Sequence, residues 1–401
     1  MTSQNRRPTM KDNQAKYPQL RFKGFTDPWE ERKLEEHAKY RRGSFPQPYG
    51  NKEWYDGEGA MPFVQVVDVT NKLTLVENTK QKISKLAQSK SVFVPKGTVV
   101  VTLQGSIGRV AITQYDSFVD RTLLIFEDYE KETDERFWAY TIQKKFEIEK
   151  LKAPGGTIKT ITKEALSSFD VHLPQFKEQA KIGSFFKQLD DTIALHQRKL
   201  AKLKELKQGY LQKLFPKNGS KFPQLRFAGF ADAWEERKLG DITKISTGKL
   251  DANAMVENGK YDFYTSGIKK YRIDVAAFEG PSITIAGNGA TVGYMHLADN
   301  KFNAYQRTYV LQEFLVDRSF IFSEIGNKLP KKIKQEARTG NIPYIVMDML
   351  TELKLSIPQN NSEQQKIGSF FKQLDDTIDL HQRKLEKLQE LKKGYLQKMF
   401  C

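Results

Sequence analysis

The thirteen residues KIGSFFKQLDDTI run from Lys181 to Ile193, and the same thirteen return from Lys366 to Ile378. Such a return within one chain indicates a duplicated unit. The likeness continues on the C-terminal side, where HQRKLAKLKELKQGYLQKLF begins at His196 and HQRKLEKLQELKKGYLQKMF begins at His381. The chain therefore ends each of two units with a nearly constant segment.

A second constant segment opens each unit. YPQLRFKGFTDPWEERKL at Tyr17–Leu34 returns as FPQLRFAGFADAWEERKL at Phe222–Leu239. We call these two stretches the lead segments. The lead segments are offset by 205 residues and the C-terminal segments by 185, so the first intervening body is the longer one. The sequence therefore predicts a pseudo-two-fold tandem repeat in which each half is a variable body between constant ends.

The two bodies keep only faint likeness to each other. GSIGRV at Gly105 resembles ATVGYM at Ala290, and DRT at Asp120 resembles QRT at Gln306. A third pair is GGTIKTI, which begins at Gly155, and GNIPYI, which begins at Gly340. We expect the two bodies to share a fold but not a surface.

The constant C-terminal segments have apolar residues at steps of three and four, which is typical of an amphipathic helix with a coiled-coil seam. The predicted seam comprises Phe186, Leu189, Ile193, His196, Leu200 and Leu203 in the first helix, and Phe371, Leu374, Ile378, His381, Leu385 and Leu388 in the second. We interpret the two histidines as polar seam positions that fix register.

The sequence also predicts where these helices begin or end and which of their residues face solvent. Pro216 stops the first helix, and Ser362 with Gln365 is interpreted as a capping box for the second. The adjacent Asp190 and Asp191, which recur as Asp375 and Asp376, point in different directions and predict a solvated helix face.

Chain connectivity predicts how the two helices run. A helix of about 37 residues is roughly 55 Å long. Only the linker Pro216–Lys221 separates the first helix from the second body. A body of about 135 residues has a radius of gyration near 14 Å, too short to carry the chain back along the helix. The second helix therefore starts where the first ends and returns antiparallel to it.

The bodies have the pattern of mixed structure. Strands are predicted in the first body at FVQVVDV, SVFVPKGTVVVTL, RVAITQY and TLLIF, and a helix at DERFWAYTIQKKFEIEKL. SITIAGNGATVGYMHL and RTYVLQEFLV take the equivalent places in the second body. The predicted fold class is α+β, with two mixed α/β domains joined by two long antiparallel helices. The expected boundaries are a disordered segment 1–16, a first body 17–172, a helix and linker 173–217, a second body 218–356 and a second helix 357–401.

Composition limits the class of protein. The 401 residues include 65 Lys and Arg against 49 Asp and Glu, a net charge of +16 that favours a nucleic-acid partner. No apolar run approaches the roughly 18 residues that a membrane span requires. The first sixteen residues have no apolar signal core, and Cys401 is the single cysteine, so we expect a reducing cytoplasm and no intramolecular disulfide.

Motifs that suggest catalysis are weak. GNGATVG at Gly287 follows a predicted strand, but its spacing differs from that of dinucleotide-binding loops and it lacks a P-loop Lys. It is either a hairpin turn or a loop whose missing side chains allow close approach to DNA. NIPY at Asn341 is one letter from an adenine-methyltransferase motif, but the other half has TIKT there. No Cys/His cluster supports a metal site. We predict no catalytic residue and no metal.

Basic residues outside the helices make both bodies electropositive. They are Arg41, Arg42, Lys96, Arg109, Arg121 and Lys159 in the first body, and Lys269, Lys270, Arg272, Arg307, Lys331, Lys332, Lys334 and Arg338 in the second.

This doubled order resembles the DNA-specificity subunit of type I restriction–modification systems. The resemblance rests on WEERKL at Trp29 and Trp234, the loops GSIG at Gly105 and ATVG at Ala290, and the IGSFFKQLDDTI tails, and it spans about residues 17–400. It implies that each body is a target-recognition domain reading one half of a bipartite, asymmetric double-stranded DNA site. It further implies that the helices set the spacing and dock two methyltransferase subunits, and that two translocase–nuclease subunits complete the complex.

The resemblance also implies a subunit without its own active site or cofactor. S-adenosylmethionine, ATP and Mg²⁺ are expected on the partners. The residues expected to contact DNA are Gln65, Gly105, Ser106, Gly108, Arg109, Arg121 and Lys159 in the first body, and Thr265, Ser266, Asn288, Gly289, Arg307 and Asn341 in the second. Two alternatives stay open. The second-ranked one is a coiled-coil scaffold with anion-binding bodies, and the third-ranked one is a stand-alone DNA-modifying enzyme.

Overall fold

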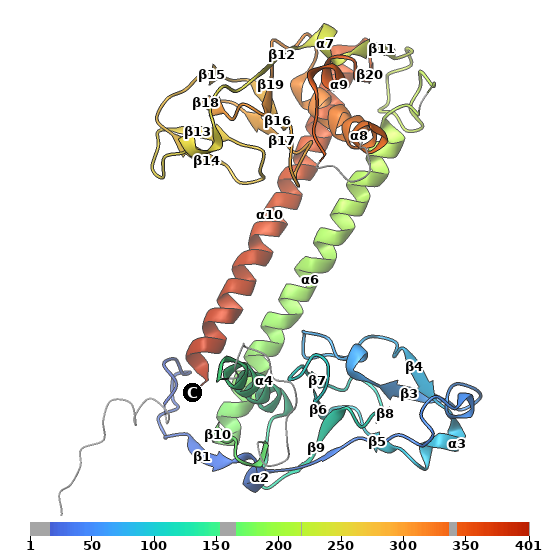
Figure 1. The fold of residues 1–401 in the computed structure, drawn as a ribbon, viewed down its shortest axis with the longest axis vertical. Helices are drawn as coiled ribbons and strands as arrows, with labels where there is room; N and C mark the ends of the chain where they lie inside the picture. Colours follow the sequence, from blue (N-terminus) through green and yellow to red (C-terminus); the bar gives the residue numbers. More distant parts are fainter. Residues whose placement is uncertain (1–16, 153–165, 218, 337–342, 401) are drawn as a thin grey trace, which may run out of the picture. The chain divides into compact units, whose positions relative to one another are not determined.

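The computed structural model describes residues 17–152, 166–217, 219–336 and 343–400. The chain divides into two compact units, one formed by Met1–His196 with Leu385–Cys401 and the other by Gln197–Lys384. Each unit contains one body and part of both long helices (Figure 1). The expectation for residues 1–16 and the role of Cys401 lie outside the described residues.

The first body is built mostly of short strands. They are β1 (Glu30–Lys33), β2 (Ala38–Arg42), β3 (Met61–Val64), β4 (Gln81–Ile83), β5 (Val92–Val94), β6 (Val99–Thr102), β7 (Val110–Ile112), β8 (Ser117–Val119), β9 (Leu123–Tyr129) and β10 (Asp170–Leu173). The helices are α2 (Leu34–His37), α3 (Lys85–Gln88), α4 (Glu135–Lys152) and the 3₁₀ turns η1 (Lys52–Trp54) and η2 (Val66–Asp68). The long helix α6 (Phe176–Leu214) follows.

The second body repeats this layout. Its strands are β11 (Glu235–Lys238), β12 (Lys244–Thr247), β13 (Tyr261–Tyr264), β14 (Tyr271–Ile273), β15 (Phe278–Glu279), β16 (Ser282–Ala286), β17 (Met295–Ala298), β18 (Lys301–Ala304), β19 (Thr308–Gln312) and β20 (Lys354–Ile357). The helices are α7 (Leu239–Ile242), η4 (Ala252–Ala254), α8 (Arg318–Glu336), α9 (Met347–Thr351) and the long α10 (Asn361–Met399).

Sheet topology is the same in both units. The first unit has sheets of order β2-β9-β6-β7, β4-β3-β8-β5 and β1-β10, and the second has β12-β19-β16-β17, β14-β13-β18-β15 and β11-β20. One pair in each second sheet, β3 with β8 and β13 with β18, is parallel. The structure confirms the predicted fold class, a tandem repeat of two mixed α/β domains with two long helices.

Several expected strands are shorter than predicted, among them RVAITQY, of which only Val110–Ile112 is a strand. FVQVVDV stops being a strand after Val64, because Gln65 begins the turn η2. SVFVPKGTVVVTL is two strands, β5 and β6, on different sheets. Pro95 and Gly97, which has a positive φ of 95°, lie in the turn between them. Proline and glycine break strands in this way because one lacks a donor and the other accepts left-handed backbone.

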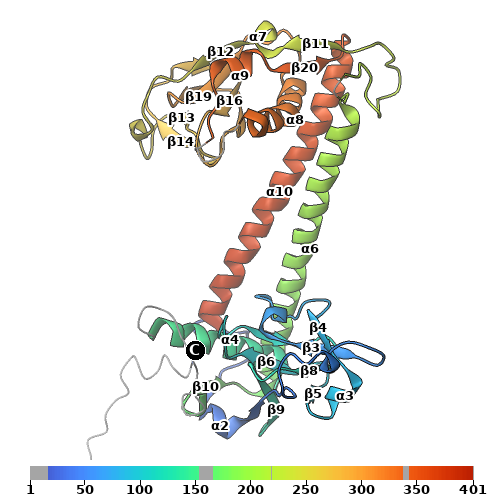
Figure 2. The same ribbon diagram turned by 45° about the vertical axis from the view of Figure 1, so that its right-hand side comes forward.

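A helix covers one sheet in each body. Helix α4 packs on β6 and β7, and α8 packs on β16. Figure 1 labels all of these elements, and Figure 2 shows α4 beside β6 from a second direction. Contact is close at a glycine in each unit: a Cβ on Gly108 would lie 2.8 Å from Phe146 of α4, and one on Gly293 would lie 2.8 Å from Ile333 of α8. These glycines allow the loops after β6 and β16 to pack directly on the helix.

The start of α10 is capped by a residue other than the one expected. The Asn360 side chain accepts the Ser362 backbone N–H at 2.9 Å, so Asn360 is the N-cap of α10. The predicted capping box of Ser362 and Gln365 is therefore wrong, because Ser362 already lies inside the helix. The first helix ends at Leu214, just before Pro216, as expected.

The long helices pack antiparallel within each unit. In the first unit Phe186 lies against Phe400, with ring centroids 5.9 Å apart, and Phe185 lies against Tyr395. In the second unit Phe371 lies against Phe215, and Phe370 against Tyr210. All twelve predicted seam side chains are buried or half-buried.

The paired aspartates are not a solvated face. Asp190 accepts from Lys392 at 2.6 Å and from the Tyr140 hydroxyl, and the equivalent Asp375 pairs with Lys207 at 2.5 Å. The prediction holds only for the neighbours Asp191 and Asp376, which are exposed. The first aspartate of each pair instead forms an ion pair between the two long helices.

The lead segments join both long helices in each unit. Arg21 donates to both carboxylate oxygens of Glu178 at 2.9 and 2.6 Å, and Arg226 does the same to Glu363 at 2.7 and 2.8 Å. Both glutamates are almost fully buried, with side chains 2% and 0% exposed.

The same segments contact the end of the other helix. The Leu20 N–H donates to the Lys398 carbonyl at 2.8 Å, and the Leu225 N–H to the Lys213 carbonyl at 2.9 Å. Trp29 packs edge-on against Phe400, and Trp234 against Phe215. The constant stretches of sequence therefore meet in one junction per unit.

Arg21→Ala and Arg226→Ala are expected to destabilise their units by about 3–5 kcal/mol, because each leaves a buried glutamate without its cation. The control Lys39→Ala removes an exposed ion pair with Asp128, for which little change is expected because solvent screens the two charges. Urea unfolding followed by circular dichroism measures the difference. Equal midpoints for Arg21→Ala and Lys39→Ala would contradict the proposed importance of the junction.

Candidate nucleic-acid interface

Three segments of each body come together at one end of its strands. These are the residues after β3 or β13, the loop between β6 and β7 or β16 and β17, and the turn before β9 or β19. In the first unit the Asp120 N–H donates to the Val64 carbonyl at 3.0 Å, and in the second the Tyr305 N–H donates to the Tyr264 carbonyl at 2.9 Å. Most of the residues expected to contact DNA lie on these segments.

Backbone hydrogen bonds align the turn before β9 with the turn before β19 in a different register from the one that the sequence similarity suggested. The Leu103 N–H donates to the Thr122 carbonyl and the Gly287 N–H to the Arg307 carbonyl, both at 2.8 Å. Thr122, rather than Arg121, is therefore equivalent to Arg307. The expected match of DRT with QRT is wrong by one residue, because backbone pairing rather than the shared letters sets the register.

In the first unit, Gln65 and Arg121 are joined through Tyr49. The Gln65 side-chain amide donates to the Tyr49 hydroxyl at 3.0 Å, and the Arg121 guanidinium lies 5.9 Å from the centre of the Tyr49 ring. Tyr49 packs against Phe45 with ring centroids 4.2 Å apart. Partial burial raises the pKa of Tyr49, so the hydroxyl stays protonated near neutral pH. Tyr49 was not among the predicted residues, although the aromatic residue in the loop QPYG was a signal.

Buried carboxylates hold this cluster in shape. Asp68 accepts the Gln65 N–H at 2.8 Å and the Lys80 N–H at 2.8 Å, and burial raises its pKa. Asp120 accepts both the backbone N–H and the hydroxyl of Thr122, at 2.9 and 2.6 Å. These bonds fix the backbone on either side of Gln65 and Arg121.

The glycine loop of the first unit is largely occupied with its own structure. The Thr102 hydroxyl donates to the Ser106 carbonyl at 2.5 Å, and the Gly108 N–H donates to the Thr102 carbonyl at 2.9 Å. Gly108 is buried against α4, and the Arg109 guanidinium reaches the Val69 carbonyl at 3.5 Å. Gly105 is exposed, with a positive φ of 62°. Of the four predicted residues in this loop, Gly105, Ser106, Gly108 and Arg109, Gly105 is the most open to a ligand.

The second unit carries a different polar set on the same segments. The Ser266 hydroxyl donates to the Asn288 side-chain oxygen at 2.5 Å, and the Thr291 hydroxyl donates to the Ser266 carbonyl. Gly289, with a positive φ of 83°, has open space where a Cβ would lie. Thr265 is buried, so its side chain is poorly placed to touch a ligand.

Exposed cations and aromatics surround this set. Arg307 is exposed, and the ammonium groups of Lys269 and Lys270 lie 5.3 and 5.4 Å from the ring centres of Tyr271 and Tyr264. Burial raises the pKa of Tyr264 to about 12. Burial also lowers the pKa of His296, whose ring lies 5.1 Å from that of Tyr264, so the imidazole is neutral near pH 7.

A further segment reaches this loop. The Ile345 N–H donates to the Gly287 carbonyl at 2.7 Å, and Tyr344 forms an isolated bridge with Asn288. Tyr344 is exposed and was not among the predicted residues, although it belongs to the NIPY motif. Two predicted residues, Lys159 and Asn341, lie outside the described residues.

Several of the basic residues are engaged in ion pairs. Arg41 pairs with Glu127 at 2.5 Å, and Arg272 pairs with Asp262. Within the described ranges no group of three or more His, Cys, Asp and Glu side chains could hold a metal ion. No helix there is both long and apolar enough to cross a membrane.

Comparison with known proteins agrees with this duplicated architecture. The family model described as "Type I restriction modification DNA specificity domain" matches residues 26–205 and, a second time, residues 231–390. The chain belongs to this family. The resemblance noted in the sequence is thereby confirmed.

Relatives of this family align over different lengths. The Type I restriction enzyme EcoDI specificity subunit of Escherichia coli is 34% identical over 164 residues, 41% of this chain and 36% of the relative's length. The Type I restriction enzyme MjaVIII specificity subunit of Methanocaldococcus jannaschii is 21% identical over 402 residues, 91% of this chain and 90% of its own. The crystal structure of the type I restriction–modification S subunit from M. genitalium shares the fold, with a TM-score of 0.71, 20% identity and coverage of 96% and 99%.

Arg121→Ala and Arg307→Ala are each expected to weaken DNA binding and to reduce its salt dependence, because an exposed guanidinium next to a polar loop can pair with phosphate or guanine. A loss of about 1–3 kcal/mol is expected for a base contact, and a salt slope reduced by about one for a phosphate contact. Fluorescence anisotropy over a salt series measures both. The ion-paired Arg41→Ala and Arg272→Ala are the matched controls, and unchanged affinity and slope in the first two variants would exclude the role.

Proposed function

We propose that the chain is the sequence-reading subunit of a type I restriction–modification complex, each body reading one half of a bipartite, asymmetric DNA site. One observation carries the proposal: the same three segments hold unlike polar side chains in the two units, Gln65 with Arg121 in one and Ser266 with Asn288 in the other. Two bodies with the same backbone topology but different exposed side chains suit two half-sites of different sequence.

Binding would divide into two kinds of contact. Exposed Lys and Arg neutralise phosphates and supply salt-dependent affinity, whereas a few side chains reach base edges. Arginine suits guanine, and glutamine or asparagine suits adenine, because their donors and acceptors match those bases in the major groove. Arg121, Gln65, Asn288 and Arg307 are the proposed base-reading candidates, and Gly105 and Gly289 allow close approach of the backbone.

We further propose that two methyltransferase subunits dock on the repeated junctions. In the first unit Leu20, Leu391 and Tyr395 line an open groove of about 530 Å³. The second unit has Leu225 and Leu206 at the equivalent places, and its lead segment makes the equivalent backbone bond to the helix end. Leu20, Leu391, Leu225 and Leu206 are 39–45% exposed. Paired apolar patches of this kind suit two copies of one partner.

Catalysis is assigned to the partner subunits, and the spacing of the half-sites to the long helices. The chain itself is proposed to be non-catalytic and without a cofactor, with S-adenosylmethionine on the methyltransferase subunits and ATP and Mg²⁺ on two translocase–nuclease subunits. The long helices α6 and α10, each of 39 residues, would set the spacing between half-sites. The complex would act on chromosomal DNA in the cytoplasm.

The deciding experiment is a genome-wide map of N6-methyladenine after co-expression of this chain with a matching methyltransferase subunit. A split, asymmetric motif that appears only with this chain is expected. Arg307→Ala should relax one half of that motif and leave the other half unchanged, because each body reads independently. A stable complex without any new motif would favour a scaffold that binds DNA without reading it.

Leu391→Asp and Leu206→Asp are each expected to release one methyltransferase copy, and the double variant both, because a charge would be buried in an apolar contact. Native mass spectrometry of the reconstituted complex gives the stoichiometry. Leu195→Asp and Leu380→Asp are matched controls, since both are exposed and lie at repeat positions on the same helices outside the groove. Full occupancy in the groove variants would exclude this docking surface.

A further inference from the structure

A basic cavity exists in the second unit beside the junction. Its volume is about 530 Å³, and it is bounded by the linker after α6, by α8 and by the strand pair β11 and β20. Six lysines line it: Lys217, Lys221, Lys328, Lys331, Lys332 and Lys354. Three glutamates lie on the same lining, Glu235, Glu236 and Glu352, and Glu336 pairs with Lys332 at 2.5 Å, which still leaves a local excess of positive charge.

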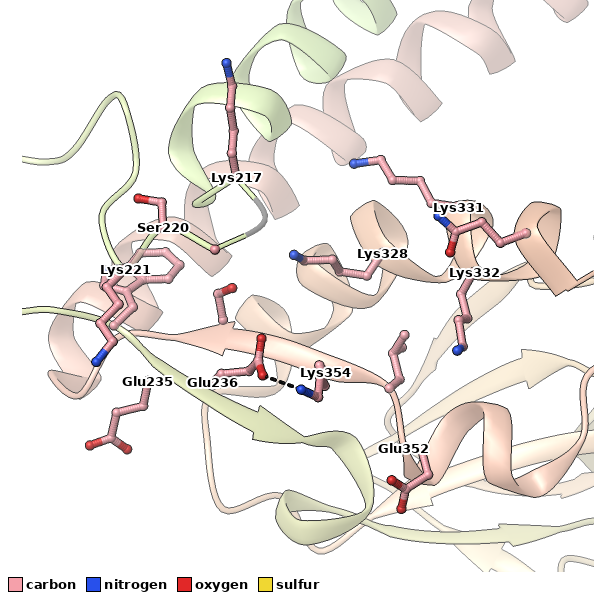
Figure 3. Close-up of a pocket in the computed structure, with 15 residues that line it drawn as sticks. Lys217, Ser220, Lys221, Glu235, Glu236, Lys328, Lys331, Lys332, Glu352 and Lys354 are labelled. Atoms are coloured by element: carbon pink, nitrogen blue, oxygen red, sulfur yellow. Dashed lines mark ion pairs between the residues drawn. The ribbon is translucent and has the colours of Figure 1, made fainter.

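The inner lysines come from rigid elements. Figure 3 shows Lys328 and Lys331 extending from α8 toward the linker, with Lys354 on the strand below paired to Glu236 at 2.8 Å. Lys217 and Lys221 lie at the rim. The volume falls within the roughly 300–1,000 Å³ of typical small-molecule sites.

The first unit has a cavity at the equivalent position, but its size and lining differ. There the cavity is only about 30 Å³, and its lining includes Ile148 and Asp170 but also Lys144 and Lys145. The caps of α4 and α8 align the two helices, because Asp134 accepts the Phe137 N–H at 2.7 Å and Asp317 accepts the Phe320 N–H at 2.8 Å.

This alignment keeps one lysine, since Lys145 of α4 stands where α8 has Lys328, and changes the charge at the two positions that follow on the same side. Ile148 and Glu149 of α4 stand where α8 has Lys331 and Lys332. Strand register adds a third exchange: Asp170 lies opposite Lys33 in the first unit, whereas Lys354 lies opposite Lys238 in the second. Because the first unit has the same topology without counterparts of Lys331, Lys332 and Lys354, the fold does not require those three lysines.

The cavity faces away from the base-reading loop. Ile333 of α8 packs toward Gly293 of that loop, whereas Lys328, Lys331 and Lys332 line the cavity on other faces of the helix. A duplex held by the loops of the second unit would therefore have α8 between itself and the cavity. A small anion fits this position better than the DNA being read.

The buried carboxyl beneath the cavity offsets its charge only in part, although the Glu324 carboxylate lies 3.9 Å from the Lys328 ammonium group. Glu324 is fully buried on α8 and accepts the N–H of Ser356, a lining residue, at 3.2 Å. Burial raises the pKa of Glu324 to about 7, so near neutral pH this carboxyl is partly protonated.

We propose that this lysine cavity is a binding site for a compact polyphosphate anion, of the class formed by inorganic triphosphate and the phosphate groups of nucleoside triphosphates. Lysine ammonium groups are common phosphate ligands because each is a compact, mobile donor of hydrogen bonds. An elongated polyanion fits less well, because the glutamates of the lining interrupt the row of lysines.

Isothermal titration calorimetry of the full chain with sodium triphosphate, at fixed ionic strength and with sulfate as a control anion, tests the proposal. Wild type should bind triphosphate saturably and sulfate weakly. Lys331→Gln with Lys332→Gln should lower the affinity by about tenfold or more, because two charges leave the site. The matched control is Lys244→Gln with Lys301→Gln, which removes two exposed charges of the same unit away from the cavity.

The outcomes are distinct. Absence of saturable binding to wild type, or equal losses in the cavity and control variants, would overturn the proposal. If the α8 variant fails to fold by circular dichroism, Lys354→Gln on β20 provides an independent test with the same expected direction. A parallel titration with random duplex at equal phosphate concentration separates the sources: a loss confined to duplex binding would show a nucleic-acid contact and refute the compact-anion site. These assays need no methyltransferase, so they are independent of the proposed function.

Discussion

Each unit depends on a buried ion pair between an arginine of the lead segment and a glutamate in the first turn of a long helix. Because two hydrogen bonds join Arg21 to Glu178 and two join Arg226 to Glu363, the direction of the chain is fixed where it enters each body. The neighbouring tryptophan and the backbone bond from the leucine before each arginine then hold the end of the other long helix. Parts of the chain that are far apart in sequence thus form one constant junction.

This junction explains why identity is concentrated at the ends of each half. The lead segment contacts both long helices at once, so a substitution there disturbs several contacts. The contacts of the β6–β7 and β16–β17 loops, such as Arg109 with Val69 and Asn288 with Ser266, stay within one body. Variation is therefore tolerated on the surface that would meet DNA. The lysine cavity shows that variation also reached the flank of a junction, where Lys354 replaces Asp170 without a change in strand pairing.

Features that repeat along the chain could be predicted from sequence, and features made by distant side chains could not. The three-and-four spacing predicted both long helices, and alternating β-branched runs predicted most strands. The capping role of Asn360 was missed because Ser362 gives an equally good local pattern. The ion pair of Asp190 with Lys392 joins residues 202 positions apart, and the cluster of Tyr49, Gln65 and Arg121 joins three loops. No local pattern encodes such contacts.

The junctions also make the order of the chain partly arbitrary. In the second unit a short linker connects Phe215, at the end of α6, to Phe222 of the lead segment. In the first unit Leu20 is bonded to Lys398 just as Leu225 is bonded to Lys213, although Leu20 and Lys398 are 378 positions apart in the sequence. Topologically the described chain is a ring opened at one of two equivalent points. A permuted chain closed there by six residues and opened within the linker would keep every contact of both junctions.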